Sequence, residues 1–150
     1  CQRLKQVLPG IINPCQAAFV KGRELLHNVL ISLDIARGHQ GQHITPRCLL
    51  KIDLQKAFDS IHWEFLHEML KGLKFPPTFI HWIMTCITSV HFQISINGQN
   101  YPSFKGGRGL KQGDPLSPPL FVISMEYLSR LLQRVSNNPL FKFHPNCKRM

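Results

Sequence analysis

The sequence is poor in acidic side chains and has no long apolar run. Of its 150 residues only 8 are Asp or Glu, against 18 Lys and Arg, and no two acids are adjacent. No apolar run approaches the length of a membrane-spanning helix, and no signal peptide is present. We therefore expect no membrane partner and no targeting signal in this chain.

The cysteines do not have the spacing of a metal site or of a disulfide framework. They are odd in number and contain no CxxC pair: Cys1, Cys15, Cys48, Cys86 and Cys147. Cys48 and Cys86 lie in apolar runs, which predicts small core residues. His39 and His43 are four positions apart without a third ligand nearby, so we interpret them as loop residues. The pattern favours a reduced, intracellular setting, in the nucleus or the cytoplasm.

Composition and charge are those of one basic globular domain. Hydrophobic residues make up 43% of the chain and charged residues 17%, and the formal net charge is +10. The basic excess is spread along the chain, with no basic tail. Such a surface predicts polyanionic partners, because phosphate backbones supply most sequence-independent affinity for it. A basic domain without a nucleic-acid role has the same composition, and charge does not separate the two.

The stretch 48–63, CLLKIDLQKAFDSIHW, organises the rest of the chain. Its apolar start has the length of a buried strand, and the later apolar residues recur at helical spacing, which predicts a turn and a helix over 63–73. Asp53 then lies at the end of a strand, where open sheets hold ligands. It either binds a divalent cation such as Mg²⁺ or caps the next turn; for a lone Asp, the cap is the better interpretation.

A second stretch, 106–121, reads GGRGLKQGDPLSPPLF. Its glycines permit positive φ or close approach to a ligand. Ser117 followed by Pro118 predicts a helix start, with Ser117 as N-cap. A basic glycine-rich loop before a helix suits phosphate or a nucleic-acid backbone. An ordinary turn before a core helix fits equally well.

The remaining elements follow from periodicity and turn signals. Apolar spacing predicts helices over 24–37 and 79–87, and residues 1–23 read as loops around a short helix, with turns at Pro9-Gly10 and Asn13-Pro14. Alternation over 92–96 followed by Asn97-Gly98 predicts a β-hairpin whose return strand spans 101–104. No internal repeat is evident.

Together these stretches resemble one family. KIDLQKAFDSIHW, from Lys51, resembles motif A of reverse transcriptases, and GLKQGDPLSPPLF, from Gly109, resembles their motif B. Upstream, QAAFVKGR over 16–23 is similar to the fingers motif QxxFVxGR. The wording is most similar to the non-LTR (LINE-type) retrotransposon enzymes, particularly those abundant in plant genomes. The resemblance covers nearly the whole chain, with the three motifs in the family's order.

The resemblance implies a fold and an activity. The fold is α+β, a partial right-hand polymerase palm with part of the fingers: one partial reverse transcriptase domain over 1–150, with 1–47 in the fingers and 48–150, which carries motifs A and B, in the palm. The activity is RNA-directed DNA polymerisation, in which a primer 3′-hydroxyl attacks a nucleotide with the help of two metal ions. The implied partners are an RNA template, a DNA primer and deoxynucleotide triphosphates, and the implied cofactor is Mg²⁺, with Mn²⁺ as an alternative.

Roles for motif A residues follow from the resemblance alone. Asp53 matches the catalytic, metal-binding carboxylate, and the Leu54 carbonyl is a second metal ligand. Phe58 matches the position whose ring rejects a 2′-hydroxyl; without the resemblance it reads as a core aromatic residue. Asp59 is interpreted as a capping or structural carboxylate.

Basic and motif B residues complete the implied site. Gln112 and Gly113 match residues that lie along the nucleotide and template, with Gly113 allowing close backbone approach. Arg108 and Lys111 would meet nucleic-acid phosphates. Lys21 and Arg23 either hold triphosphate or template phosphates or are ordinary surface charges, two interpretations of equal weight.

One family motif has no match in the sequence. Motif C, an aromatic-x-Asp-Asp hairpin, would follow 138–150, and the chain begins at Cys1 rather than Met. We therefore expect a fragment that is inactive as a polymerase by itself and exposes apolar surface. The alternatives are a non-catalytic nucleic-acid-binding remnant of a retrotransposon, or a basic structural domain.

Overall fold

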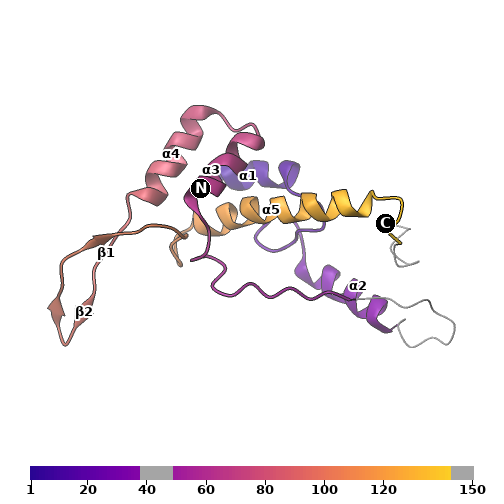
Figure 1. The fold of residues 1–150 in the computed structure, drawn as a ribbon, viewed down its shortest axis with the longest axis horizontal. Helices are drawn as coiled ribbons and strands as arrows, with labels where there is room; N and C mark the ends of the chain where they lie inside the picture. Colours follow the sequence, from indigo (N-terminus) through magenta and orange to yellow (C-terminus); the bar gives the residue numbers. More distant parts are fainter. Residues whose placement is uncertain (38–48, 143–150) are drawn as a thin grey trace.

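A computed structural model describes residues 1–37 and 49–142 as a mixture of helices and two small sheets (Figure 1). The helices are α1 (Gln2–Ile11), α2 (Leu25–Arg37), α3 (Trp63–Gly72), α4 (Pro77–Thr88) and α5 (Ser117–Ser136). The strands are β1 (His91–Phe92), β2 (Ser95–Ile96), β3 (Gln99–Asn100) and β4 (Phe104–Lys105). No helix in this described part is long and apolar enough to cross a membrane.

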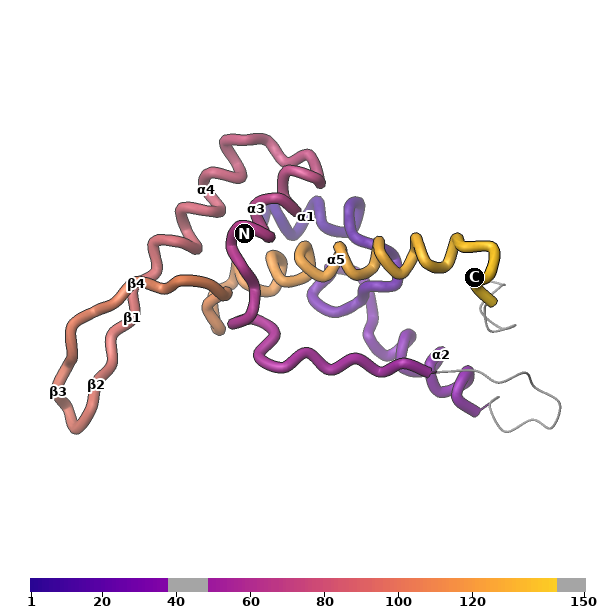
Figure 2. Tube along the Cα trace, in the orientation of Figure 1, coloured from indigo at the N-terminus to yellow at the C-terminus, as the bar shows by residue number. Residues whose placement is uncertain are grey.

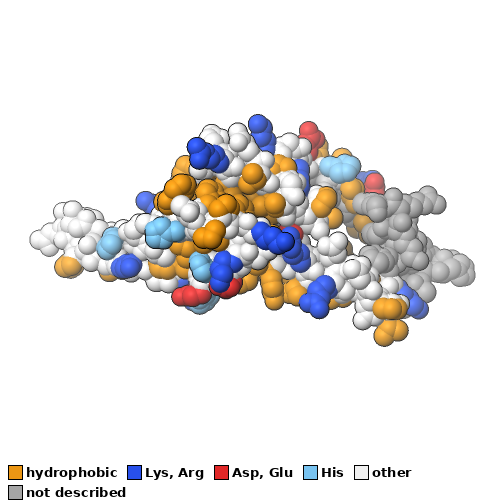
Figure 3. Space-filling view, turned by 90° about the horizontal axis from the view of Figure 1, so that it is seen from above, with side chains coloured by type: hydrophobic (Ala, Val, Ile, Leu, Met, Phe, Trp, Pro, Cys, Tyr) orange, Lys and Arg blue, Asp and Glu red, His pale blue; other side chains and the backbone are white. Residues whose placement is uncertain are grey.

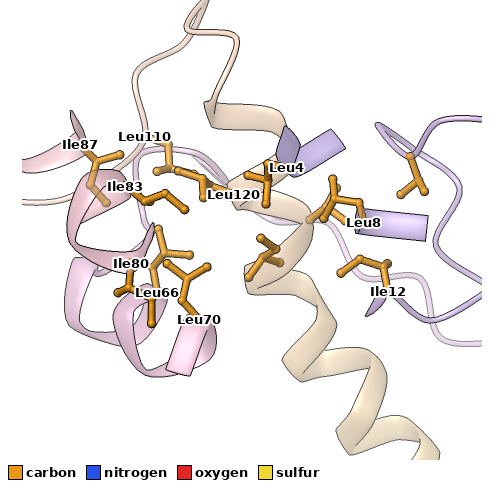
Figure 4. Close-up of a cluster of buried hydrophobic side chains, with 13 residues drawn as sticks. Leu4, Leu8, Ile12, Leu66, Leu70, Ile80, Ile83, Ile87, Leu110 and Leu120 are labelled. Atoms are coloured by element: carbon orange, nitrogen blue, oxygen red, sulfur yellow. The ribbon is translucent and has the colours of Figure 1, made fainter. Parts of the chain in front are cut away.

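The core lies between α1, α3, α4 and the first half of α5. Figure 4 shows their apolar side chains converging from separate helices on one cluster. Leu4 with Leu8 and Leu66 with Leu70 are four positions apart, so each pair lies on one helix face. The buried members are Leu4, Leu8, Ile12, Val20, Leu66, Leu70, Ile80, Ile83, Ile87, Leu110, Leu120, Val122 and Ile123.

Apolar periodicity located the helices correctly. The ranges 24–37, 63–73 and 79–87 correspond to α2, α3 and α4. The turn expected at Pro9-Gly10 is wrong, because Pro9 lies inside α1. A helical proline costs roughly 3 kcal/mol, but α1 also buries Leu4 and Leu8, each contributing about 1.5–3 kcal/mol.

The hairpin around Asn97-Gly98 is confirmed. Both residues have positive φ, 51° and 79°, as a type I′ turn requires. Ser95 pairs with Asn100 and Ile96 with Gln99 in one sheet. At the base, β1 pairs with β4 in the other. The return segment therefore begins earlier than the predicted 101–104. Figure 2 shows the hairpin projecting away from the helices.

The strand predicted over 48–52 does not form where it is described. Residues 49–52 have no strand structure, and Leu49 and Leu50 are 66% and 75% exposed. A strand requires a hydrogen-bonded neighbour, and no described segment donates to or accepts from this backbone. Figure 1 shows it as an extended trace leading into α3. Among its neighbours in sequence, α2 also has no buried residue.

The start of α5 differs from the prediction by one residue. Leu116 is the N-cap, and Ser117 is the first helical residue. The Ser117 hydroxyl donates to the Lys111 carbonyl at 2.6 Å instead of capping the helix. Asp114 Oδ1 accepts from the Leu116 N–H at 2.7 Å, so the Asp makes the local turn.

Of the predictions made for Cys86, Cys48, His39 and His43, the structure tests only the one for Cys86. Cys86 is exposed, not a core residue, because Ile83 and Ile87 occupy the buried face of α4. Cys48, His39 and His43 lie outside the described residues. Cys1, Cys15 and Cys86 are free cysteines.

Candidate active site

Two stretches distant in sequence are joined by backbone hydrogen bonds. The Gly109 N–H donates to the Ile61 carbonyl at 2.8 Å, and the Leu110 N–H donates to the Phe58 carbonyl at 2.9 Å. Trp63 Nε1 adds a bond to the Gly109 carbonyl at 2.8 Å. The segment that precedes α3 and the loop that precedes α5 are therefore one local unit.

The two glycines of this loop have different requirements. A Cβ at Gly109, whose φ is +89°, would lie 3.0 Å from both Cα and the carbonyl oxygen of Asp59. Gly109 thus permits the close approach that the two backbone bonds need. Gly113 has a φ of +86°, but nothing lies within 4 Å of an added Cβ. Within the described chain its need is therefore conformational, and the predicted close approach of Gly113 to a nucleotide or template stays a prediction.

A pocket of about 560 Å³ lies beside this unit. Arg108, Lys111 and Gln112, three predicted site residues, line it together with Asp59 and Asp114. The rest of the wall is mainly apolar: Trp63, Cys86, Ile87, Val90, Phe92, Gly109, Leu110, Leu116 and Ser117. Small-molecule sites have this size and this combination of apolar wall and few polar groups.

Asp53 and Leu54 lie outside that lining, in the exposed extended stretch. Both are solvent-exposed, and neither has a hydrogen-bond partner in the described part of the chain. Across residues 1–37 and 49–142 there is no group of three His, Cys, Asp or Glu side chains that could hold a metal ion. A Mg²⁺ site takes several oxygen ligands. Asp53 and the Leu54 carbonyl, the two predicted ligands, would by themselves be an incomplete set.

Phe58 is anchored against the core. Its ring stacks on Phe121 of α5, with centroids 4.9 Å apart and an interplanar angle of 23°. It is half-buried and packs on the buried cluster. The contact with Phe121 holds the Phe58 ring in place. The Phe58 backbone is also bonded to the loop, because its carbonyl accepts from the Leu110 N–H.

Lys21 and Arg23 line a second pocket, of about 570 Å³, with Pro118 and Pro119 of α5. Lys21 is exposed. Both terminal nitrogens of Arg23 instead bond backbone carbonyls that follow or end α1. Nη1 donates to Asn13 and Gln16, each at 2.7 Å, and Nη2 to Pro9 at 2.9 Å and Ile12 at 3.1 Å. Arg23 therefore satisfies carbonyls at the end of a helix.

Sequence reasoning missed Glu126. It is 4% exposed, its Oε2 accepts from the Asn13 N–H at 2.8 Å, and its Oε1 accepts from Arg130 Nε at 2.9 Å. The available signal was an acid three positions after Ile123, on the apolar face of α5. Glu126 and Arg23 therefore both bond the backbone of Asn13, one at its N–H and the other at its carbonyl.

The start of α5 is not a ready anion site. Pro118 and Pro119 have no N–H, and the N–H groups of Leu116, Ser117 and Leu120 are bonded within the loop and first turn. Phosphate binding here would therefore rely on the side chains of Arg108 and Lys111.

Comparison with known proteins gives one family. The model described as "Reverse transcriptase (RNA-dependent DNA polymerase)" matches residues 1–143. The chain is 31% identical over 132 residues to "Transposon TX1 uncharacterized 149 kDa protein" of Xenopus laevis, covering 88% of this chain and 10% of that protein.

A second relative has a more explicit description. The chain is 29% identical over 120 residues to "Retrovirus-related Pol polyprotein from type-2 retrotransposable element R2DM" of Drosophila melanogaster, covering 80% of this chain and 11% of that protein. A Pol polyprotein from element R2 of Popillia japonica is 29% identical over 100 residues, which cover 67% of this chain and 16% of that protein. The chain thus spans a small part of the length of these non-LTR retrotransposon proteins.

Proposed function

The chain belongs to the reverse transcriptase (RNA-dependent DNA polymerase) family, and from this we propose that it forms part of an RNA-directed DNA polymerase of a non-LTR retrotransposon. Residues 1–47 contribute to the fingers and residues 48–150 to the palm. Its partners are an RNA template, a DNA primer and deoxynucleotide triphosphates.

One observation carries the proposal. The hydrogen bonds from Gly109 and Leu110 to Ile61 and Phe58 join the motif A-like and motif B-like stretches. A polymerase must place groups from both motifs around one incoming nucleotide, because catalysis by positioning depends on such convergence. A joint between the two stretches is the local structure that this requires.

Residues of the joint receive roles in nucleotide binding. Phe58, held by Phe121, would reject a 2′-hydroxyl by steric overlap and so select deoxynucleotides. Gln112 and Gly113 would lie along the nucleotide and template. Lys21 would contact the triphosphate. Arg23 would contribute to nucleotide binding indirectly, because its bonds to Asn13 and Gln16 hold the loop that carries Lys21.

Divalent metal is general in this family, and Asp53 with the Leu54 carbonyl would be ligands for Mg²⁺ or Mn²⁺. When bound, the metal stabilises charge on the reacting phosphate oxygens. The described residues do not complete its ligand set, so no catalytic step is assigned to this chain alone. We expect the isolated chain to bind primer–template without extending it.

Nucleic-acid binding falls to the basic side chains. Arg108 and Lys111 are exposed on the loop and would meet phosphates. Elsewhere the charge is dispersed; Figure 3 shows Lys and Arg side chains scattered over one face rather than gathered in one patch. The loop pair is therefore the local feature to test.

The test is equilibrium binding of a fluorescent RNA–DNA hybrid, followed by anisotropy at several salt concentrations. The affinity should fall steeply with salt, and Arg108→Ala/Lys111→Ala should weaken binding and reduce the salt slope by about 2. The matched control, Lys71→Ala/Arg134→Ala, removes two exposed cations from helices. Equal effects of the two double variants would contradict the assigned contact, and binding independent of salt would contradict the function.

A second candidate is a non-catalytic nucleic-acid-binding remnant. It fits the basic composition, net charge +10, which suits nucleic-acid phosphates without requiring a metal site. Primer extension separates the two when the chain is assayed within the longer protein: deoxynucleotide incorporation abolished by Asp53→Asn supports the polymerase. Hybrid binding with no incorporation in that protein supports the remnant.

A further inference from the structure

The 560 Å³ pocket has a chemistry that the metal and nucleotide roles above do not use. Its lining contains two aromatic rings, Trp63 and Phe92. A Cβ at Gly106 would lie 3.0 Å from Phe92 Cε2 and 3.7 Å from Trp63 Cη2, so both rings lie against the same backbone position. Unpaired nucleic-acid bases bind by stacking on aromatic side chains of this kind.

The aromatic wall is held in place. Trp63 Nε1 donates to the Gly109 carbonyl, which satisfies the only polar group of the indole. Phe92 stacks on Phe104 with centroids 5.9 Å apart. Rings fixed in this way lose little conformational entropy when a flat ligand stacks on them.

The polar lining offers both hydrogen-bond donors and acceptors. The side chains of Asp59, Arg108, Lys111 and Gln112 have no hydrogen-bond or ion-pair partner in the part of the chain that the structure describes. Asp114 differs, because Oδ1 accepts from the Leu116 N–H. Asp59 is thus the carboxylate of the lining without a local bond.

The position of Asp59 is fixed by its neighbours. The carbonyls of Phe58 and Ile61, on either side of it, accept the bonds from Leu110 and Gly109. Its Cα also lies where a side chain at residue 109 would clash. Its backbone is therefore locked beside Arg108 and Gly109 at the pocket.

We propose that this pocket binds an unpaired guanine base of a single strand, stacked on Trp63 and Phe92 and recognised by Asp59. A carboxylate accepts hydrogen bonds from two adjacent donors, and guanine presents N1–H and N2–H₂ side by side, whereas adenine, cytosine and uracil do not. Arg108 and Lys111 bind the flanking phosphates. The assignment rests on the proposed function only in taking that strand to be the template beside the hybrid.

The test uses Trp63 fluorescence. Trp82, 56% exposed on α4, is the other tryptophan, so Trp82→Phe leaves Trp63 as the single reporter. Titration with guanosine monophosphate should quench the Trp63 fluorescence saturably. Guanosine monophosphate should bind about tenfold more tightly than adenosine monophosphate, because only guanine forms the bidentate pair with Asp59. Hybrids carrying a one-nucleotide 5′ template overhang should show the same order, guanine first.

Variants separate stacking from recognition. Asp59→Asn should remove the guanine preference while quenching remains, and the control Asp34→Asn, an exposed acid on α2, should change neither. Phe92→Leu should weaken the binding of all four bases about fivefold or more, because the loss of a stacking ring is not base-specific. Circular dichroism confirms that each variant is folded.

The outcomes distinguish this inference from the proposed function. Salt-dependent binding of blunt hybrids, with no quenching and no effect of the overhanging base, overturns the base pocket and leaves the polymerase assignment intact. Guanine-selective quenching without hybrid binding supports the pocket and contradicts the polymerase. Quenching that persists unchanged in Asp59→Asn, including its base preference, overturns the role of Asp59.

Discussion

The two halves of α5 have the same type of side chain in opposite environments. In the first half Leu120, Val122 and Ile123 are fully buried, whereas in the second Leu132 and Val135 are each 54% exposed. The first half packs on α1 and α3, while the second extends past them. Apolar side chains at helical spacing therefore do not by themselves say which part of a helix is buried.

The same difference separates the site into two parts. The unit formed by 58–63 and 108–117 rests on the buried half of α5, through Phe58 on Phe121 and Ser117 on Lys111. Asp53 and Leu54 lie in the exposed stretch that starts at residue 49. The structure thus fixes the loop 108–117 more firmly than the carboxylate that is proposed to act with it.

The largest expected effect compares two leucines of α5. Leu120→Ala, at a fully buried position, should lower the free energy of unfolding by about 2–5 kcal/mol. Leu132→Ala, at a 54% exposed position, should change it by less than about 1 kcal/mol. Urea denaturation measures both. Similar losses at the two positions would mean that the second half is covered in solution.

The next effect concerns the loop between α1 and α2. Arg23→Lys removes the planar group that reaches four carbonyls, so the free energy of unfolding should fall by about 1–3 kcal/mol. Lys21→Ala, at an exposed neighbour, is the control and should stay within about 0.5 kcal/mol. If Arg23→Lys were as stable as the parent but bound triphosphate more weakly, direct phosphate contact would replace the structural role.

The two loop glycines sharpen the comparison inside the site. Gly113→Ala places a side chain at positive φ in open space and should cost about 1–2 kcal/mol. Gly109→Ala adds the contact with the Asp59 backbone and should cost more, and it should also weaken the Trp63 bond. Denaturation and the Trp63 emission maximum report the two effects. A smaller loss at Gly109 than at Gly113 would argue against the joint.

The sequence predicted the elements that depend on local signals and failed for those that depend on contacts with a distant segment. The helices and the hairpin were predictable because their signals are local: periodicity for α3 and α4, and Asn97-Gly98 for the turn. The strand at 49–52 was not, because strand formation depends on a neighbour that sequence does not reveal. Cys86 failed for a related reason, since an apolar run does not say which helix face is buried.

The site shows the same division. Arg108, Lys111 and Gln112 were identified by motif and do line one pocket. Other features could not be predicted, because each depends on contacts between segments distant in sequence. They are the placement of Asp59 at the pocket, the bonds from Arg23 to backbone carbonyls, and the burial of Glu126. The charge of a side chain does not indicate whether it will make structural hydrogen bonds, as Arg23 and Glu126 do, or remain unbonded within the described residues, as Asp59 does.

The smallest expected effect lies on the exposed surface of α3. The hydrogen bond from Lys71 Nζ, and then that with His67, lowers the pKa of Glu68. Because the folded-state pKa lies below the unfolded one, the contribution is present at neutral pH and is lost as pH falls through the folded value. Glu68→Gln should therefore be slightly less stable than the parent at pH 7 and equal to it in acid or high salt. Thermal unfolding at both pH values checks this.

The central claim is that 53–63 and 108–117 contact one nucleotide. Photo-crosslinking with 8-azido-deoxyadenosine triphosphate, mapped by mass spectrometry, tests it most directly. The account predicts labelled peptides from both stretches, with competition by deoxyadenosine triphosphate stronger than by adenosine triphosphate, and loss of that difference in Phe58→Ala. Label confined to one stretch, or to α2 and the end of α5, would contradict it.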